Sequence, residues 1–222
     1  MCGRFEIHSA IEIIAKIFGI DEWDIDYMPS YNVAPSQDII IAIDKGKRQL
    51  IKSRWGFLPS WAKDISDGYK MINARAESVA EKPSFKQAFH KQRCLVLADG
   101  FFEWKKEGKI KKPYLIRLKS EQPFAMAGLY NKWISPDGEE IMTNTIITTE
   151  SNDLIRPLHD RMPVILPEDN YADWLISDIV DPSSLLKMLK PYPSDELEVY
   201  EVTSKVNSPA VNTPENIQRL AF

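Results

Sequence analysis

The chain has 222 residues, of which 44% are hydrophobic and 27% are charged, and its formal net charge is −4. This length fits one large domain or two small ones, and it allows enough buried surface for a core that needs no disulfide or metal ion for stability. The negative charge argues against a protein that coats DNA by charge alone, but it allows a local basic cleft. No apolar run approaches the roughly 18 residues of a membrane span and no signal-peptide pattern occurs, so we expect a soluble cytoplasmic protein.

The cysteines and histidines are few and far apart. The chain contains Cys2 and Cys94, with His8, His90 and His159 as its histidines. No Cys-x-x-Cys pair and no closely spaced histidine pair is present, and these are the usual zinc-ligand patterns. We therefore expect no disulfide framework, no metal site and no cofactor.

The first predicted element is a helix over residues 10–18. Apolar side chains recur there at i, i+3, i+4, i+7 and i+8, which is the helical period. Ser9 and Glu12 have the spacing of a capping box, and Gly19 supplies a stop. Residues 2–7 are left as a short extended segment that leads into the body of the protein.

Short β-branched and aromatic runs bounded by turn residues predict strands along the rest of the chain. The expected strands cover residues 39–43, 49–55, 94–98, 101–104, 114–118, 124–129, 144–148, 164–166 and 198–202. Residues 20–36 look like a loop, and helices are expected at residues 84–91, 168–175 and 183–189. Many strands without regular βαβ alternation predict a single α+β domain over residues 1–222, built on a curved, mostly antiparallel sheet.

Cys2 follows the initiator methionine, so removal of Met1 would leave a terminal cysteine with its amine and thiol on adjacent carbons. An aldehyde condenses with such an amine to give an imine, and attack by the thiol closes a thiazolidine ring. The amine's reference pKa of about 7.7–8.0 leaves a neutral fraction at cellular pH, and tethering gives the thiol a high effective concentration. The alternatives are an N-terminal nucleophile acting on an amide and a small second residue without a function.

Residues 71–78 alternate polar and small side chains. If this segment is extended, Asn73, Arg75 and Glu77 lie on one face and two alanines lie on the other. The polar face then lines a cleft or forms a solvated edge strand, and these residues alone favour neither.

Glu103 stands among aromatic residues after a predicted buried strand. An apolar wall raises the pKa of a carboxyl group and suits it to proton transfer near neutral pH. The alternative is a surface carboxylate at a strand end. The lysines that follow, between residues 105 and 112, are expected on a solvated hairpin.

Two further segments combine chemistry with restricted backbone. His159 and Arg161 stand between prolines, where a histidine suits proton transfer and an arginine suits phosphate recognition; this favours a functional loop over a structural histidine. Residues 54–63 place Trp55 and Trp61 beside basic residues, as in stacking sites for unpaired bases. At least one of the two tryptophans is expected in the core.

Taken in chain order, these segments resemble a known family. They read Met-Cys-Gly-Arg, Tyr-Asn-Val-Ala-Pro-Ser-Gln, Arg-Trp-Gly-Phe-Leu-Pro-Ser-Trp, Asn-Ala-Arg-Ala-Glu, Gly-Phe-Phe-Glu-Trp and Leu-His-Asp-Arg-Met-Pro. The set is similar to the motifs of the SOS-response-associated peptidase family from residue 2 to residue 163, and the Val206-Asn207 tail is compatible with it. The resemblance implies a barrel-like core with peripheral helices.

The same resemblance implies that Cys2 forms a thiazolidine DNA–protein crosslink with the ring-opened aldehyde of an abasic site in single-stranded DNA. It implies that Glu103 and His159 move protons, that Asn73 orients the linkage, and that the N-terminus is self-processed. The residues that it assigns to DNA are Arg4, Arg75 and Arg161 for phosphates, and Trp61 with Pro35 for shaping or stacking against the strand.

Trp55 and Glu77 also match motif positions and are expected to be structural supports. We expect a monomer whose partner is single-stranded DNA with abasic sites, with no membrane partner, and which associates with the nucleoid when bound. The alternatives are a cysteine peptidase or N-terminal-nucleophile amidohydrolase acting on other substrates, and a DNA-binding module in which Cys2 is incidental. Amidotransferases of that class usually carry an apolar residue where this chain has Arg4.

Overall fold

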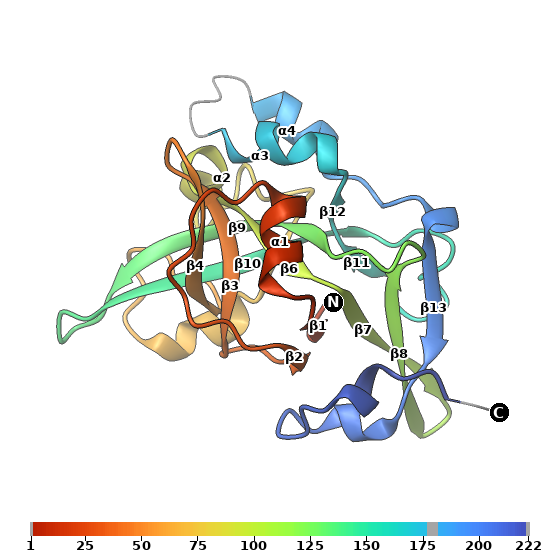
Figure 1. Ribbon diagram of the computed structural model, residues 1–222. Helices are drawn as coiled ribbons and strands as arrows, with labels where there is room; N and C mark the ends of the chain where they lie inside the picture. Colours follow the sequence, from red (N-terminus) through yellow and green to blue (C-terminus); the bar gives the residue numbers. More distant parts are fainter. Residues whose placement is uncertain (1, 177–181, 221–222) are drawn as a thin grey trace.

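The computed structural model describes residues 2–176 and 182–220 and contains two β-sheets with peripheral helices (Figure 1). The smaller sheet has the strand order β13-β8-β7-β1-β2, and its pairings are antiparallel. Its strands are β1 (Phe5–Ile7), β2 (Ser30–Val33), β7 (Gly100–Glu107), β8 (Ile110–Leu118) and β13 (Leu197–Glu201). The chain start therefore lies inside this sheet, between β7 and β2.

The larger sheet closes on itself. Its strand order is β11-β10-β4-β3-β6-β9-β12, with β5 on β10, and an additional pairing of β10 with β9 completes a ring. Its strands are β3 (Asp38–Asp44), β4 (Arg48–Trp55), β5 (Asn73–Arg75), β6 (Arg93–Ala98), β9 (Phe124–Ile134), β10 (Glu140–Glu150), β11 (Arg161–Pro163) and β12 (Ile165–Leu166). Only β4 and β5 run parallel to their partner β10 among the described pairings. This confirms the predicted α+β class with a mostly antiparallel, barrel-like core.

The helices are short and lie outside the sheets (Figure 1). They are α1 (Ile11–Phe18), α2 (Lys86–Lys91), α3 (Tyr171–Leu175) and α4 (Pro182–Met188), with single 3-10 turns η1 (Ile65–Lys70), η2 (Glu168–Asn170), η3 (Ser194–Glu196), η4 (Ser204–Asn207) and η5 (Pro214–Ile217). A search of the described residues finds no helix with the length and apolar character needed to cross a membrane.

Local sequence explains the best-predicted elements. β3 and β4 pair in register, with Ile41 opposite Ile51. The run Ile39–Ile43 is buried throughout, because β3 is an inner strand of the sheet, between β4 and β6. In α1, Ile14 and Phe18 are buried, as their spacing of one turn predicts. Gly19 ends α1 in the left-handed conformation with φ of 58°, as predicted.

The predicted capping box of α1 is wrong, and the helix expected over residues 84–91 is shorter than predicted. The N-cap of α1 is Ala10, and its side chain makes no capping hydrogen bond. Ser9 instead donates its hydroxyl to Asp99, which offers a charged acceptor from another strand. The helix expected from Ser84 begins only at Lys86 and also lacks a side-chain cap.

Three predicted segments differ from the structure in detail. The expected loop at residues 20–36 contains β2, and the proline-bounded loop around His159 ends in β11. β5 covers only Asn73–Arg75, so Glu77 lies in the turn that follows. These strands have three or four residues, which is too short for an alternating pattern to identify.

One large cluster of buried apolar side chains extends from Cys2 to Leu197. Phe5 of β1 packs against Trp55 of β4 with ring centroids 5.1 Å apart, which joins the two sheets. Trp55 also donates its indole N–H to the carbonyl of Ile72 at 2.9 Å. The chain start and the segment before β5 are thus held by the same buried tryptophan, in line with its expected structural role.

Candidate functional site

The N-terminal segment carries Cys2 into the protein core. Beyond the end of β1, the N–H of Phe102 in β7 donates to the carbonyl of Arg4 at 2.9 Å. The antiparallel register with β7 therefore continues toward the chain start, and extending it by one residue sets Gly3 opposite Glu103. Cys2 comes next and is fully buried.

Asp99 fixes the other end of β1, where the chain turns into α1. Its Oδ2 accepts the N–H groups of His8 at 2.6 Å and Ser9 at 2.9 Å. His8 Nδ1 lies 2.6 Å from Oε2 of Glu6. Glu6, His8 and Asp99 form the one cluster of potential metal ligands within the described residues, but these internal hydrogen bonds engage their atoms. The cluster acts as a brace for β1.

Asn73 holds the carbonyl of Cys2. Its Nδ2 donates to Cys2 O at 2.8 Å. The side chain is placed by β5, which pairs in parallel with β10 through Asn73 and Ile146, and the buried Ala74 faces the other way. Asn73 Oδ1 is buried and accepts no hydrogen bond from the described part of the chain. An acceptor is therefore available directly beside the terminal cysteine.

Glu103 is buried in β7, with only 3% of the residue exposed. Burial raises the pKa of its carboxyl group from 4.5 to about 7. The pKa of the Cys2 thiol is raised well above its usual value, first by burial and then by the negative charge of Glu103. The thiol thus stays protonated at neutral pH. The Glu103 carboxyl group, which can accept a proton, is close enough to raise the pKa of this thiol.

His159 is oriented by the backbone of its own loop. Its Nδ1 accepts the N–H of Arg161 at 2.9 Å and also lies 2.9 Å from a carboxylate oxygen of the exposed Asp160. Burial lowers the pKa of His159, so the imidazole is neutral at pH 7. A neutral ring that accepts at Nδ1 carries its proton on Nε2. Because Nδ1 faces both the Arg161 N–H and the Asp160 carboxylate, the neutral ring can carry its proton on either nitrogen.

Glu103 and His159 line the same open pocket of about 420 Å³. The other described residues around it are Arg4, Trp104, Lys111 and Asn207. The pocket therefore combines two groups suited to proton transfer with two cationic side chains. Cys2 is not among the described lining residues. Glu103 does line the pocket, and its charge raises the pKa of the Cys2 thiol.

The three predicted phosphate-binding arginines differ in what they contact. Arg4 donates through Nη1 to Asn32 Oδ1 at 2.7 Å and to a carbonyl of the C-terminal segment at 2.8 Å. Arg161 forms a two-point ion pair with Glu77 at 2.6 and 3.0 Å, which gives Glu77 its expected supporting role. Arg75 is exposed at the end of β5. Of the three, Arg75 has the side chain most open to solvent.

Trp61 and Pro35 lie in separate loops. Trp61 is 61% exposed, in the loop between Gly56 and Gly68. A Cβ on Gly68 would lie 2.7 Å from the carbonyl oxygen of Gly56, so the two backbones approach where only glycine fits. Pro35 is half-buried in the turn after β2. No described contact brings Trp61 and Pro35 together with Glu103.

Asn32 is a supporting residue that the sequence analysis missed. Its side-chain amide donates to the carbonyls of Val206 at 3.2 Å, Ser208 at 2.9 Å and Val211 at 2.6 Å. With its oxygen bound to Arg4, it ties the C-terminal segment to the site. In the sequence, the signal is a single amide residue in the run Tyr-Asn-Val-Ala. In the structure Asn32 is only 1% exposed, and a buried amide requires hydrogen-bond partners.

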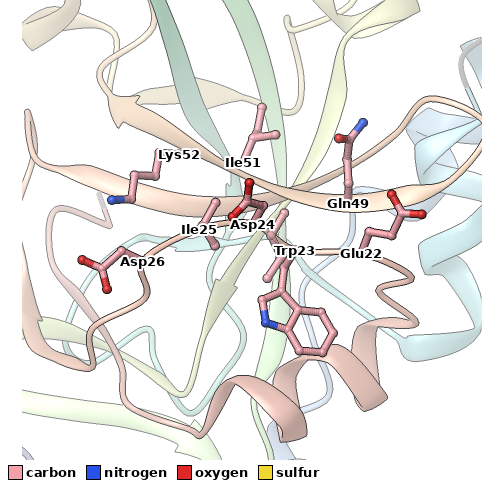
Figure 2. Close-up of a pocket in the computed structure, with 9 residues that line it drawn as sticks. Glu22, Trp23, Asp24, Ile25, Asp26, Gln49, Ile51 and Lys52 are labelled. Atoms are coloured by element: carbon pink, nitrogen blue, oxygen red, sulfur yellow. The ribbon is translucent and has the colours of Figure 1, made fainter.

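A second hollow lies away from these residues and is acidic (Figure 2). It has a volume of about 550 Å³ and lies between residues 22–26 and residues 49–52 of β4. Glu22, Asp24 and Asp26 line it beside Trp23, which is 41% exposed. Its carboxylates repel anionic groups such as phosphates, so this hollow is not suited to bind them.

Known proteins are similar to this chain over nearly its whole length. A family model described as SOS response associated peptidase (SRAP) matches residues 1–209. The abasic site processing protein YoqW of Bacillus subtilis (strain 168) is 50% identical over 222 residues, covering 98% of this chain and 99% of the relative. The abasic site processing protein HMCES of Mus musculus is 32% identical, covering 97% of this chain and 75% of the relative. A crystal structure from Bacteroides thetaiotaomicron has a TM-score of 0.79 at 30% identity, covering 100% of this chain and 98% of that one.

Proposed function

Because this chain belongs to the SOS response associated peptidase family, we propose that it processes abasic sites in single-stranded DNA by crosslinking to them through Cys2. The observation that carries the proposal is the burial of Cys2 beside Glu103, a carboxyl group whose pKa is raised to about 7. The relatives named for abasic site processing cover nearly the whole chain, including the part that holds these residues.

The proposed chemistry starts after Met1 is removed. The neutral α-amine of Cys2 attacks the aldehyde carbon of the ring-opened sugar and forms a carbinolamine. Glu103 in its acid form, or the Nε2–H of His159, protonates the hydroxyl group, which leaves as water and gives an imine. The thiol then adds to the imine carbon while its proton passes to the nitrogen. The net reaction joins one aldehyde to one cysteine as a thiazolidine and releases one water.

The protonation states favour this order of steps. A thiol with a raised pKa is a weak first nucleophile, since the thiolate is the reactive form. The amine is therefore expected to react first, and the tethered thiol closes the ring as its proton passes to the imine nitrogen. Asn73 holds the Cys2 carbonyl at 2.8 Å and keeps an acceptor oxygen for the linkage.

The experiment is a crosslinking assay with single-stranded DNA that carries one abasic site. Wild type is expected to give a heat-stable shifted band on a denaturing gel. Cys2→Ala is expected to give none, and Cys2→Ser to stop at a labile imine that borohydride traps. Crosslinking by Cys2→Ala at the wild-type level would overturn the proposal.

Removal of Met1 is a condition of this mechanism. With Met1 retained, the α-amine belongs to another residue and Cys2 has only a thiol to offer. Intact mass spectrometry of the purified protein is expected to show a chain that begins at Cys2. If the family's peptidase activity performs this removal, Cys2→Ala protein expressed in the same host is expected to be processed differently from wild type.

A further inference from the structure

We propose that one face of the β7–β8 hairpin binds the phosphate backbone of the DNA strand as it leaves the reactive pocket. This inference rests on the proposed function, because it assigns the path of the same DNA. The face is formed by Lys106 and Lys111, with Lys109 at the turn between the strands. In Figure 1 the hairpin projects beside the C-terminal segment, away from the barrel.

The strand register places like charges directly opposite each other. Lys105 pairs with Lys112, and Lys106 pairs with Lys111. Like charges at facing positions of an antiparallel pair are unfavourable. Because side chains alternate along a strand, the two pairs lie on opposite faces of the hairpin.

Only one of the two faces is neutralised by the protein. Glu107 lies 3.0 Å from Lys105 Nζ and 3.2 Å from Lys112 Nζ, and Glu201 lies 3.6 Å from Lys112 Nζ. On the other face, Lys106 and Lys111 have no carboxylate within 4 Å among the residues that the structure describes, and the same holds for Lys109.

The uncompensated face is continuous with the reactive pocket. Lys111 lines that pocket together with Arg4 and Trp104. Trp104 is on the same face as Lys106 and Lys111, because it lies two residues before Lys106 in β7. The Arg4 guanidinium lies 5.9 Å from the centre of the Trp104 ring. A row of positive charge therefore starts at Arg4 inside the pocket and continues outward along the hairpin.

Phosphodiester oxygens are the ligand that this row fits. Successive side chains on one face of a strand are about 6.6 Å apart, and lysine ammonium groups on flexible stems adapt to a mobile single strand. An acidic protein would also be attracted, but the row begins in the pocket that holds the reacting groups. The strand that leaves this pocket therefore passes Lys111 and continues along the hairpin.

The test measures non-covalent binding with an abasic analogue that lacks the aldehyde, such as tetrahydrofuran. Lys106→Ala/Lys111→Ala is expected to bind single-stranded DNA several-fold more weakly than wild type. The slope of log K against log salt concentration is expected to fall by about 1.4, since each phosphate contact on a single strand contributes roughly 0.7. The matched control is Lys105→Ala/Lys112→Ala, which removes the same charge from the neutralised face and is expected to bind as wild type does.

Placing the analogue at the 5′ or the 3′ end of the oligonucleotide tests the path of the strand. The defect of Lys106→Ala/Lys111→Ala is expected with only one of these two DNAs, because the hairpin lies on one side of the pocket. Equal binding by the two double variants, or an equal defect with both DNAs, would overturn the inference. The melting temperature of Lys106→Ala/Lys111→Ala is expected to stay at the wild-type value or above it, because like-charge repulsion is relieved.

Crosslinking separates this inference from the proposed function. At saturating protein, Lys106→Ala is expected to reach the wild-type crosslink yield with true abasic DNA, because it leaves Lys111 and the other pocket-lining residues unchanged. Failure of the wild type to crosslink would reject the proposed function. Wild-type crosslinking with no change in affinity or salt slope in Lys106→Ala/Lys111→Ala would reject the hairpin alone.

Discussion

Glu103 is buried where an ionised carboxylate loses most of its hydration. Its pKa of about 7 means that both protonation states are populated at cellular pH, so it can give a proton and take one back. Glu6 in β1 also has a pKa raised to about 7 by burial, but its carboxylate is engaged by His8. The same shift thus suits Glu103 to proton transfer, whereas Glu6 is held in a hydrogen bond that braces β1.

Glu103→Gln is expected to slow crosslink formation and reversal while it stabilises the fold above neutral pH. The native pKa lies above the unfolded value of 4.5, so the carboxyl group favours folding below pH 4.5. That contribution is lost as pH rises through about 7, and at pH 8 the ionised group costs on the order of 3 kcal/mol. Thermal unfolding from pH 5 to pH 8 is expected to show a melting-temperature gap between variant and wild type that widens with pH.

The control for this prediction is Glu139→Gln, which makes the same change at an exposed position in the β9–β10 turn. It is expected to leave both the crosslinking rate and the pH dependence unchanged. A Glu103→Gln protein that crosslinks and reverses at the wild-type rate would refute the role of Glu103 in proton transfer. A constant melting-temperature gap across pH would refute the raised pKa.

At this scale, the sequence identified chemical types better than contacts. The aromatic neighbours of Glu103 predicted a raised pKa, and this prediction is confirmed. The ion pair of Arg161 with Glu77 and the contacts of Arg4 with Asn32 were not predictable, because the partners lie 84 and 28 residues away. Which arginine is open to a phosphate depends on these distant partners. The phosphate roles of the arginines remain predictions.

The side chain of Asp99 anchors the end of β1 that leads into α1, and this gives a prediction for the element. Asp99→Ala leaves the N–H groups of His8 and Ser9 without their acceptor. Hydrogen bonds to a charged group contribute roughly 1.5–3 kcal/mol each, so we expect a loss of about 3 kcal/mol in unfolding free energy. Hydrogen exchange is expected to accelerate in residues 2–9, and crosslinking is expected to slow.

The matched control is Asp137→Ala, at an exposed position in the β9–β10 turn. It is expected to change neither exchange nor crosslinking. Faster exchange throughout the barrel in Asp99→Ala, without a larger effect in residues 2–9, would contradict the anchoring role. Chemical denaturation provides the unfolding free energies of both variants.

Long periodic elements were predictable and short ones were not. The β3–β4 hairpin and α1 follow from patterns of seven or more residues that agree with burial. β2 and β11 owe their existence to partners in other parts of the chain, so their few residues carry no signal alone. The capping box at Ser9 was wrong for a related reason, since the Ser9 hydroxyl donates to Asp99 and does not cap the helix.

At the scale of the molecule, the core predicts a single unfolding transition. The main apolar cluster includes residues from Cys2 to Leu197, and the C-terminal segment is tied to the site through Asn32. Far-ultraviolet circular dichroism and tryptophan fluorescence are therefore expected to give the same midpoint in urea. Different midpoints would contradict the prediction that residues 1–222 form one domain.

The distribution of charge matters more than its total. The net charge of −4 gave only a weak argument against DNA binding. In the structure, three carboxylates line the hollow at Trp23 beside a single lysine, Lys52 (Figure 2), whereas Arg4 and Lys111 line the pocket of Glu103. The sequence could not predict this separation, because residues of both signs alternate along the chain and only folding sorts them.

The close approach of Gly56 and Gly68 has a consequence for engineering. The two glycines clamp the base of the loop that carries Trp61, so the barrel meets that loop through a stem of fixed geometry. Exposed positions such as Trp61 can be substituted while the stem and the buried Leu58 and Ala62 are kept. The protein thereby provides a scaffold on which the exposed surface of this loop can be redesigned without a change at Cys2.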